Sequence, residues 1–250
     1  MSLRILACGV FRDALRHLRL PGHHPGLQVT YLPPSLHNQP RELKKELSRQ
    51  IHLARKEGES ILCMYGQCFP EMDDFLQQQR IPRPAGAHCY EMLLGSKPFR
   101  RVMEEDAGTY FLEKELILHF SEYCLQPLEL HDPQMRQWCF QHYRKILYIR
   151  QPLDPDLVPR ARDLAHFLAL HLTVMDADYS ELKANLLKLI QGSRSPQDSV
   201  PKFLGNYLNN EKAEKAQKGE KKAALSDPPL GEGKKEKIRL VERVARGYMA

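Results

Sequence analysis

The segment Arg4–Cys8 reads RILAC, and Gly9 follows it directly. This short apolar run precedes a pattern of helical periodicity from about Phe11 to Leu18. A second apolar run, Leu27–Leu32 (LQVTYL), comes next. A strand, a helix and another strand in this order are typical of a parallel unit with a right-handed crossover. The opening segment therefore predicts an α/β fold.

The same alternation continues through most of the chain. Further strands are predicted at Ser60–Tyr65, Gly108–Leu112, Lys145–Ile149 and Leu170–Met175. Further helices are predicted at Pro40–Lys56, Met72–Gln79, Cys89–Leu94, Lys97–Glu105, Glu115–Cys124, Pro133–Tyr143, Asp156–Leu168 and Tyr179–Ile190. We expect a mostly parallel sheet flanked by helices over residues 1–190, with a division into two small Rossmann-like halves, about 1–125 and 126–190.

Composition and charge set limits on the function. With 42% hydrophobic and 27% charged residues, the chain has globular composition, and no apolar run reaches the ~20 residues of a membrane span. Of the formal net charge of +6, a share of +4 lies in residues 209–250. The nearly neutral remainder argues against a nucleic-acid reader, which would carry a basic stripe on its folded face. Residues 191–250 are expected to form a linker and a charged, largely disordered tail.

The cysteines are the most informative residues. Six in 250 residues are too few for a disulfide scaffold, so we expect a cytoplasmic protein with reduced thiols. In that compartment, spaced cysteines favour metal binding or catalysis. Cys8 ends the first predicted strand, Cys68 follows the third, and Cys89 opens a predicted helix. Because ligands bind outside the carboxyl ends of parallel strands, these three thiols are predicted to share a site.

Three thiols suit a small set of metal centres. Together with the neighbouring His88 they would complete a four-ligand zinc site. Without the histidine, they would hold a 4Fe–4S cluster with one iron free for substrate. A helix N-terminus at Cys89 would lower the pKa of its thiol. Gly66, which follows Tyr65 at the end of the third strand, would let the backbone approach a bulky ligand. The alternative for each cysteine is a small buried hydrophobe without a function.

A second group of candidates follows the second strand. His37 and Asn38 lie where that strand passes into a helix, on the same predicted edge. With Tyr65 and Gly66 they are predicted to contact a cofactor or substrate, or to orient its ligands.

Five short strings resemble those of the uncharacterised family catalogued as domain of unknown function 1638 (DUF1638), in similar order and spacing. They are Leu6–Gly9 (LACG), Leu36–Asn38 (LHN), Tyr65–Cys68 (YGQC), His88–Gly95 (HCYEMLLG) and Gly108–Phe111 (GTYF). The resemblance runs from about residue 3 to about residue 190 and leaves out the charged tail. It implies a matched set of three cysteines, Cys8, Cys68 and Cys89. Many relatives have Asp at the position of His88, which places its role as a ligand in doubt.

The resemblance also implies a setting, namely anaerobic metabolism near corrinoid-dependent methyltransferase systems. Three functions remain open. The first is a metal or iron–sulfur protein, with a 4Fe–4S cluster or zinc on the three cysteines. The second is a metal-free thiol enzyme, with Cys68 or Cys89 as nucleophile and His88 or Glu91 as acid or base. The third is an accessory protein whose basic tail binds a corrinoid protein or a methyltransferase.

Overall fold

The computed structural model describes residues 2–193. The tail predicted for residues 191–250 lies outside the described residues, except for 191–193 at the end of the last helix. The helices and strands follow one another in the order β1 (Leu3–Cys8), α1 (Arg12–His17), α2 (Leu20–His23), β2 (Leu27–Leu32), α3 (Pro40–Lys56), β3 (Ser60–Met64), α4 (Met72–Gln78), α5 (Cys89–Leu94), α6 (Ser96–Glu105), β4 (Thr109–Leu112), α7 (Lys114–Leu118), α8 (Pro133–Phe140), β5 (Lys145–Arg150), α9 (Val158–Leu168), β6 (His171–Asp176) and α10 (Ser180–Gly192). Within the described part of the chain no helix is long and apolar enough to cross a membrane.

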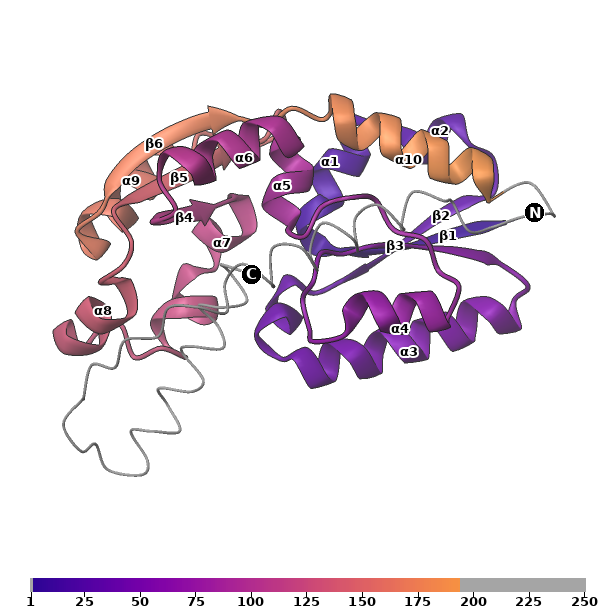
Figure 1. The fold of residues 1–250 in the computed structure, drawn as a ribbon, viewed down its shortest axis with the longest axis horizontal. Coiled ribbons are helices and arrows are strands. Elements are labelled where there is room, and N and C mark those ends of the chain that lie inside the picture. Colours follow the sequence, from indigo (N-terminus) through magenta and orange to yellow (C-terminus); the bar gives the residue numbers. More distant parts are fainter. Residues whose placement is uncertain (1, 194–250) are drawn as a thin grey trace, which may run out of the picture.

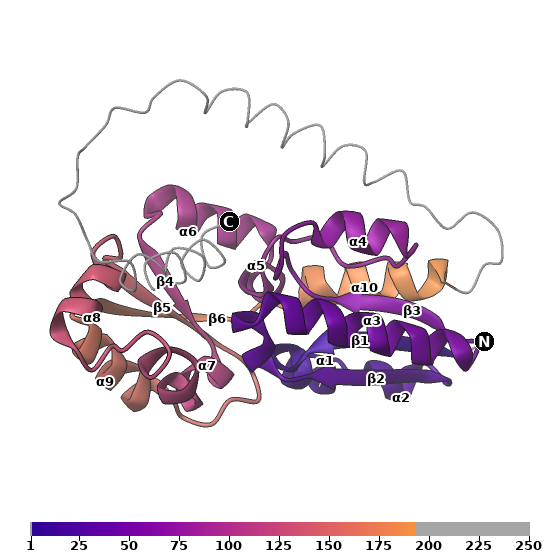
Figure 2. The same ribbon diagram turned by 90° about the horizontal axis from the view of Figure 1, so that it is seen from below.

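The strands form two three-stranded parallel sheets, which confirms the predicted α/β fold. The N-terminal sheet has the order β2-β1-β3 and the C-terminal sheet the order β4-β5-β6. Figures 1 and 2 show the sheets side by side along the long axis of the molecule. The sheets divide between Met64 and Thr109, earlier than the division near residue 125 in the sequence analysis, because β4 pairs with β5. The C-terminal helix α10 then returns to the N-terminal sheet (Figure 1).

The N-terminal sheet is covered on both faces, as its apolar strands require. All residues of β1 are buried except the half-buried Arg4. Helices α3 and α4 lie on one face, and α1, α2 and α10 on the other (Figure 1). The predicted stripe of α3, with Leu43, Leu47 and Ile51, is buried against this core.

A second core surrounds the C-terminal sheet. It joins β4 and β5 to α7 and α9 through side chains such as Leu112, Ile117 and Ala161. Strand β6 differs from the others, because most of its residues are exposed. The helix predicted over Glu115–Cys124 is divided in the structure into α7 and a π-helical turn, Ser121–Leu125.

Candidate functional site

A cavity of about 60 Å³ lies at the carboxyl ends of strands from both sheets. In the N-terminal half, the cavity is lined by the end of β1, the turn after β2, the loop after β3 and the start of α5. In the C-terminal half, it is lined by the residue after β4, α7 and the π-helical turn. The lining residues are Cys8, Val10, Phe11, Pro34, His37, Tyr65, Gly66, Gln67, Cys68, Ala87, His88, Cys89, Tyr90, Glu113, Leu116 and Tyr123. The carboxyl edges of two sheets thus meet at one cavity, which is where parallel sheets bind ligands.

The three thiols selected from the sequence all line this cavity. Cys8 is the last residue of β1 and is buried, while Cys68 and Cys89 are half-buried. Parallel pairing of β1 with β3 brings the first two together, although 60 residues of sequence separate them. The charge of a Cys68 thiolate raises the pKa of Cys8, and both raise the pKa of Cys89, as expected for neighbouring thiols.

Close backbone contact holds Cys68 and Cys89 near each other. The Gln67 N–H donates to the Ala87 carbonyl at 2.8 Å, which joins the loop after β3 to the loop before α5. A Cβ built on Gly66 would lie 2.3 Å from that carbonyl oxygen. The sequence analysis assigned Gly66 to contact with a ligand, but the close approach that requires a glycine is made to Ala87.

A half-buried arginine, Arg83, holds the outer side of the same loops. The Arg83 guanidinium forms an ion pair with Asp73 at 2.7 Å and donates to the Gly86 carbonyl at 2.7 Å. The Gln67 side chain donates to the same carboxylate at 2.9 Å. The loops that carry two of the three thiols are therefore held by charge-assisted hydrogen bonds.

The structure overturns the expectation of an acidic thiol at Cys89. Cys89 does open α5, but burial raises the pKa of its thiol well above the usual range. Burial also raises the pKa of Cys8, and raises that of Cys68 to about 12. Helix α5 has only six residues, and its dipole does not offset the desolvation of the thiolate. All three thiols are therefore protonated at neutral pH in the metal-free protein.

Two histidines also line the cavity, and both are neutral at neutral pH. Burial lowers the pKa of His88 to about 4, and the charge of a protonated His37 would lower it further. Burial likewise lowers the pKa of His37. The neutral imidazole is the form that binds metals. The imidazole of His88 also lies 5.9 Å, centroid to centroid, from the ring of Phe99.

Asn38, one of the residues predicted to contact a cofactor or to orient its ligands, bonds to the C-terminal half. It does not line the cavity, and its side-chain amide donates to the Tyr123 carbonyl at 2.8 Å. Tyr123 belongs to the π-helical turn of the C-terminal half and does line the cavity. Asn38 therefore links the two halves beside the cavity. A π-helical turn changes the hydrogen-bond pattern of its carbonyls, and such turns are frequent at functional sites.

Tyr65 places a polar group in the cavity that has no partner. Its side chain is 2% exposed, and its hydroxyl makes no hydrogen bond to any described residue. Burial and the neighbouring Cys8 raise the pKa of this hydroxyl, so it stays protonated. A buried hydroxyl without a partner is uncommon and indicates a bound molecule or a strained contact.

Glu113 is a cavity residue that the sequence analysis missed. It follows β4 directly and is 3% exposed. Its carboxylate oxygens accept the N–H groups of Glu115 at 2.7 Å and Leu116 at 2.8 Å, which caps α7. Burial nevertheless raises the pKa of Glu113 to about 8. Glu113 is the first polar residue after a buried strand, so the rule that selected Cys8 could also have selected it.

The described side chains do not form a preassembled metal site. Among residues 2–193, no group of three or more His, Cys, Asp or Glu side chains stands close enough to hold a metal ion. Ligation by the three thiols would therefore require their side chains to turn toward the centre of the cavity. The donor set itself, three sulfurs and neutral imidazoles, matches the ligands that zinc and iron–sulfur clusters use.

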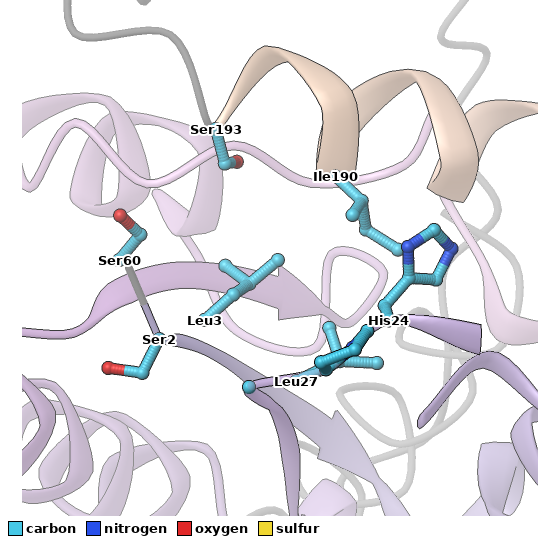
Figure 3. Close-up of a pocket in the computed structure, with 9 residues that line it drawn as sticks. Ser2, Leu3, His24, Leu27, Ser60, Ile190 and Ser193 are labelled. Carbon is cyan, nitrogen blue, oxygen red and sulfur yellow. The ribbon is translucent and has the colours of Figure 1, made fainter. Parts of the chain in front are cut away.

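A second cavity lies at the opposite end of the N-terminal sheet. It measures about 10 Å³ and lies between the amino ends of the strands and the end of α10. Figure 3 shows its lining side chains, among them Ser2, His24 and Ser60. This volume is close to the minimum for a single water molecule, so the cavity is too small for a substrate.

The three cavity thiols lie in strings that resemble the DUF1638 family, and a family model matches the chain. The model described as "Protein of unknown function (DUF1638)" matches residues 31–186. The chain belongs to the DUF1638 family. The match covers the C-terminal sheet, β3, the last two residues of β2 and every cavity residue from Pro34 onward, while Cys8, Val10 and Phe11 precede it. No curated protein and no solved structure matches the chain.

Proposed function

We propose that this DUF1638 protein binds a metal centre in the cavity between its two sheets. Cys8, Cys68 and Cys89 would ligate zinc or a 4Fe–4S cluster, and a small molecule would bind at a position that the protein leaves open. The observation that supports the proposal is that three thiols from separate segments line one cavity of about 60 Å³. A metal would supply Lewis acidity or redox chemistry there.

The chemistry of the cavity favours a metal over a free nucleophile. Burial raises the pKa of all three thiols, whereas a catalytic cysteine needs an accessible thiolate at neutral pH. A metal ion replaces the thiol protons and removes this penalty. Of the two bases proposed for a thiol enzyme, Glu91 does not line the cavity, and its carboxylate accepts the Ala87 N–H at 2.8 Å.

His88 is the candidate for a fourth ligand. Its neutral imidazole lines the cavity next to Cys89. A zinc site would use it to complete four ligands, whereas a cluster with an open iron would not need it. The variant His88→Ala, which removes the imidazole and puts no other ligand in its place, therefore separates the two centres, because only the zinc site would lose a ligand.

The corrinoid- or methyltransferase-linked setting rests on the family resemblance, and we propose it as the metabolic context of the site. The tail that would bind such a partner lies outside the described residues. Deletion of residues 205–250 should then abolish co-purification with the partner protein. Undiminished co-purification of the truncated chain would remove the tail from this role.

Anaerobic purification followed by metal and sulfide analysis tests the proposal. We expect either about one zinc per chain, or about four iron and four sulfide per chain with a brown colour. Each of Cys8→Ser, Cys68→Ser and Cys89→Ser should lower the metal content at least fivefold. Cys139→Ser is the matched control, because Cys139 is also half-buried but packs against the C-terminal core.

Two results would contradict the proposal. One is less than ~0.2 metal per chain after anaerobic reconstitution, since a real site should fill under those conditions. The other is equal loss of metal from the control variant and the three cavity variants. Rapid iodoacetamide labelling of a single cavity cysteine in the metal-free protein would instead favour the thiol enzyme.

A further inference from the structure

Two polar residues from opposite halves of the molecule line the cavity together with the three thiols. Tyr65 follows β3 of the N-terminal sheet, and Glu113 follows β4 of the C-terminal sheet. Their side chains are 2% and 3% exposed. Neither residue is one of the three cysteines. A ligand that contacts both would therefore be recognised by residues other than the proposed metal ligands.

The hydrogen bonds of these two groups are incomplete in the described part of the chain. The Tyr65 hydroxyl has no partner there. The Glu113 carboxyl accepts two backbone N–H groups and donates to no described residue. Since its pKa is about 8, most of it carries a proton at neutral pH, and that proton can be donated to a ligand. A buried polar group without a partner costs free energy that a bound molecule would recover.

The charged side chains around the cavity restrict the net charge of the ligand. Among the described residues, no lysine or arginine lines the cavity. Cations on the adjoining segments have other partners: Lys114 pairs with Asp13, Arg83 pairs with Asp73, and the Arg12 guanidinium lies over the Tyr31 ring. In the metal-free cavity a buried anion would therefore have no counter-ion among the described lining side chains, and its desolvation would be uncompensated. A buried cation would meet one carboxyl among the described lining residues, that of Glu113, whose two oxygens already accept backbone N–H groups of α7.

The volume of the cavity restricts the size of the ligand. About 60 Å³ exceeds the 10–15 Å³ that one water needs by roughly fourfold, so the cavity accommodates a molecule of a few non-hydrogen atoms. We propose that the cavity binds a small uncharged molecule whose polar group bridges the Tyr65 hydroxyl and the Glu113 carboxyl. The inference deepens the proposed function, because it names the ligand class of the same cavity, and it rests on that function for the neighbouring metal.

Three probes of nearly equal shape test the charge preference on the full-length protein. Acetamide is uncharged, acetate is an anion and acetamidinium is a cation. Each is titrated by ligand-observed NMR into the metal-depleted protein at pH 7, where no metal can ligate acetate. We expect acetamide to bind and both charged probes to bind at least tenfold more weakly. Equal or tighter binding of either charged probe, or no binding of acetamide, would overturn the inference.

Variants test the two residues. Tyr65→Phe and Glu113→Gln should each weaken acetamide binding at least fivefold in the metal-depleted protein, where a change in metal content cannot contribute. Tyr143→Phe is the matched control, because Tyr143 is another buried tyrosine whose hydroxyl has no partner among the described residues, and it does not line the cavity. Wild-type acetamide affinity in Tyr65→Phe, or an equal loss in the control, would refute the assignment.

The metal measurements keep the two proposals apart. Normal metal loading with no acetamide binding rejects the ligand class alone. Acetamide binding that depends on Tyr65 and Glu113 in a protein that takes up no metal rejects the metal centre alone.

Discussion

The substitution Gly66→Ala tests how the site is assembled. The added methyl group would lie 2.3 Å from the Ala87 carbonyl oxygen and 3.0 Å from the Ala87 carbonyl carbon and the His88 Cα. These are backbone atoms, so no side-chain rotation can relieve the contact. The loop after β3 and the loop before α5 must separate, and the 2.8 Å hydrogen bond from Gln67 to Ala87 must lengthen or break.

The expected loss of stability follows from these two effects. Overpacking at a well-packed position costs about 1–3 kcal/mol. Loss of a typical hydrogen bond costs about 0.5–1.5 kcal/mol more. We therefore expect Gly66→Ala to lower the free energy of unfolding by about 2–4 kcal/mol. Because the two loops carry Cys68 and Cys89, the variant should also bind less metal under conditions where it remains folded.

Urea denaturation followed by circular dichroism measures the change, with metal content measured in parallel. Gly192→Ala is the matched control, since an added methyl group at this residue at the end of α10 meets no atom within 4 Å. Alanine is the better helix former, so the control should be unchanged or more stable by about 0.5–1 kcal/mol. A Gly66→Ala variant that unfolds at the wild-type urea concentration would refute the reasoning, because it would mean that the loops do not touch.

Three further variants probe separate contacts. Asn38→Ala removes the 2.8 Å hydrogen bond to Tyr123 and should lower the free energy of unfolding by about 0.5–1.5 kcal/mol; no change in a urea titration would show that this link between the halves contributes nothing. Burial raises the pKa of Glu113 from 4.5 to about 8, so the folded state holds a proton that the unfolded state releases, and stability falls as pH rises between these values. The difference in unfolding free energy between wild type and Glu113→Gln, measured across pH 5–9, should show that fall, and a pH-independent difference would contradict the raised pKa. Arg83→Lys keeps the positive charge but removes the guanidinium that contacts both Asp73 and the Gly86 carbonyl. We expect the free energy of unfolding, measured by thermal or urea denaturation, to fall by about 1–2 kcal/mol. Wild-type stability would show that a guanidinium is not needed at this position.

Local pattern was sufficient to predict most of the secondary structure. The apolar run of β1 and the stripe of α3 each lie where their residues predict, because burial on a strand or on one helix face leaves a periodic trace in the sequence. The π-helical turn left no such trace. Its wider hydrogen-bond pattern depends on the packing of the C-terminal half, and the same apolar residues also suit a continuous helix.

The pairing of strands was harder to predict. The sequence shows that parallel strands are present, but two sheets of three leave the same local pattern as one larger sheet. The pairing of β4 distinguishes the two arrangements. Because β4 pairs with β5, it belongs to a second sheet of the order β4-β5-β6. Strand partners are chosen by contacts between residues far apart in sequence, which no local window contains.

The sequence by itself determined the chemistry available at the site, because thiols after buried strands of a parallel sheet must lie at its carboxyl edge. Tertiary structure decided which groups meet those thiols and in what protonation state. It placed Glu113 and Tyr123 of the C-terminal half in the same cavity as the thiols. It also packed Gly66 against the Ala87 carbonyl, which is the contact that requires a glycine there. It also made the thiols weak acids, since the degree of desolvation depends on everything that packs around a group and not on the residues beside it in the chain.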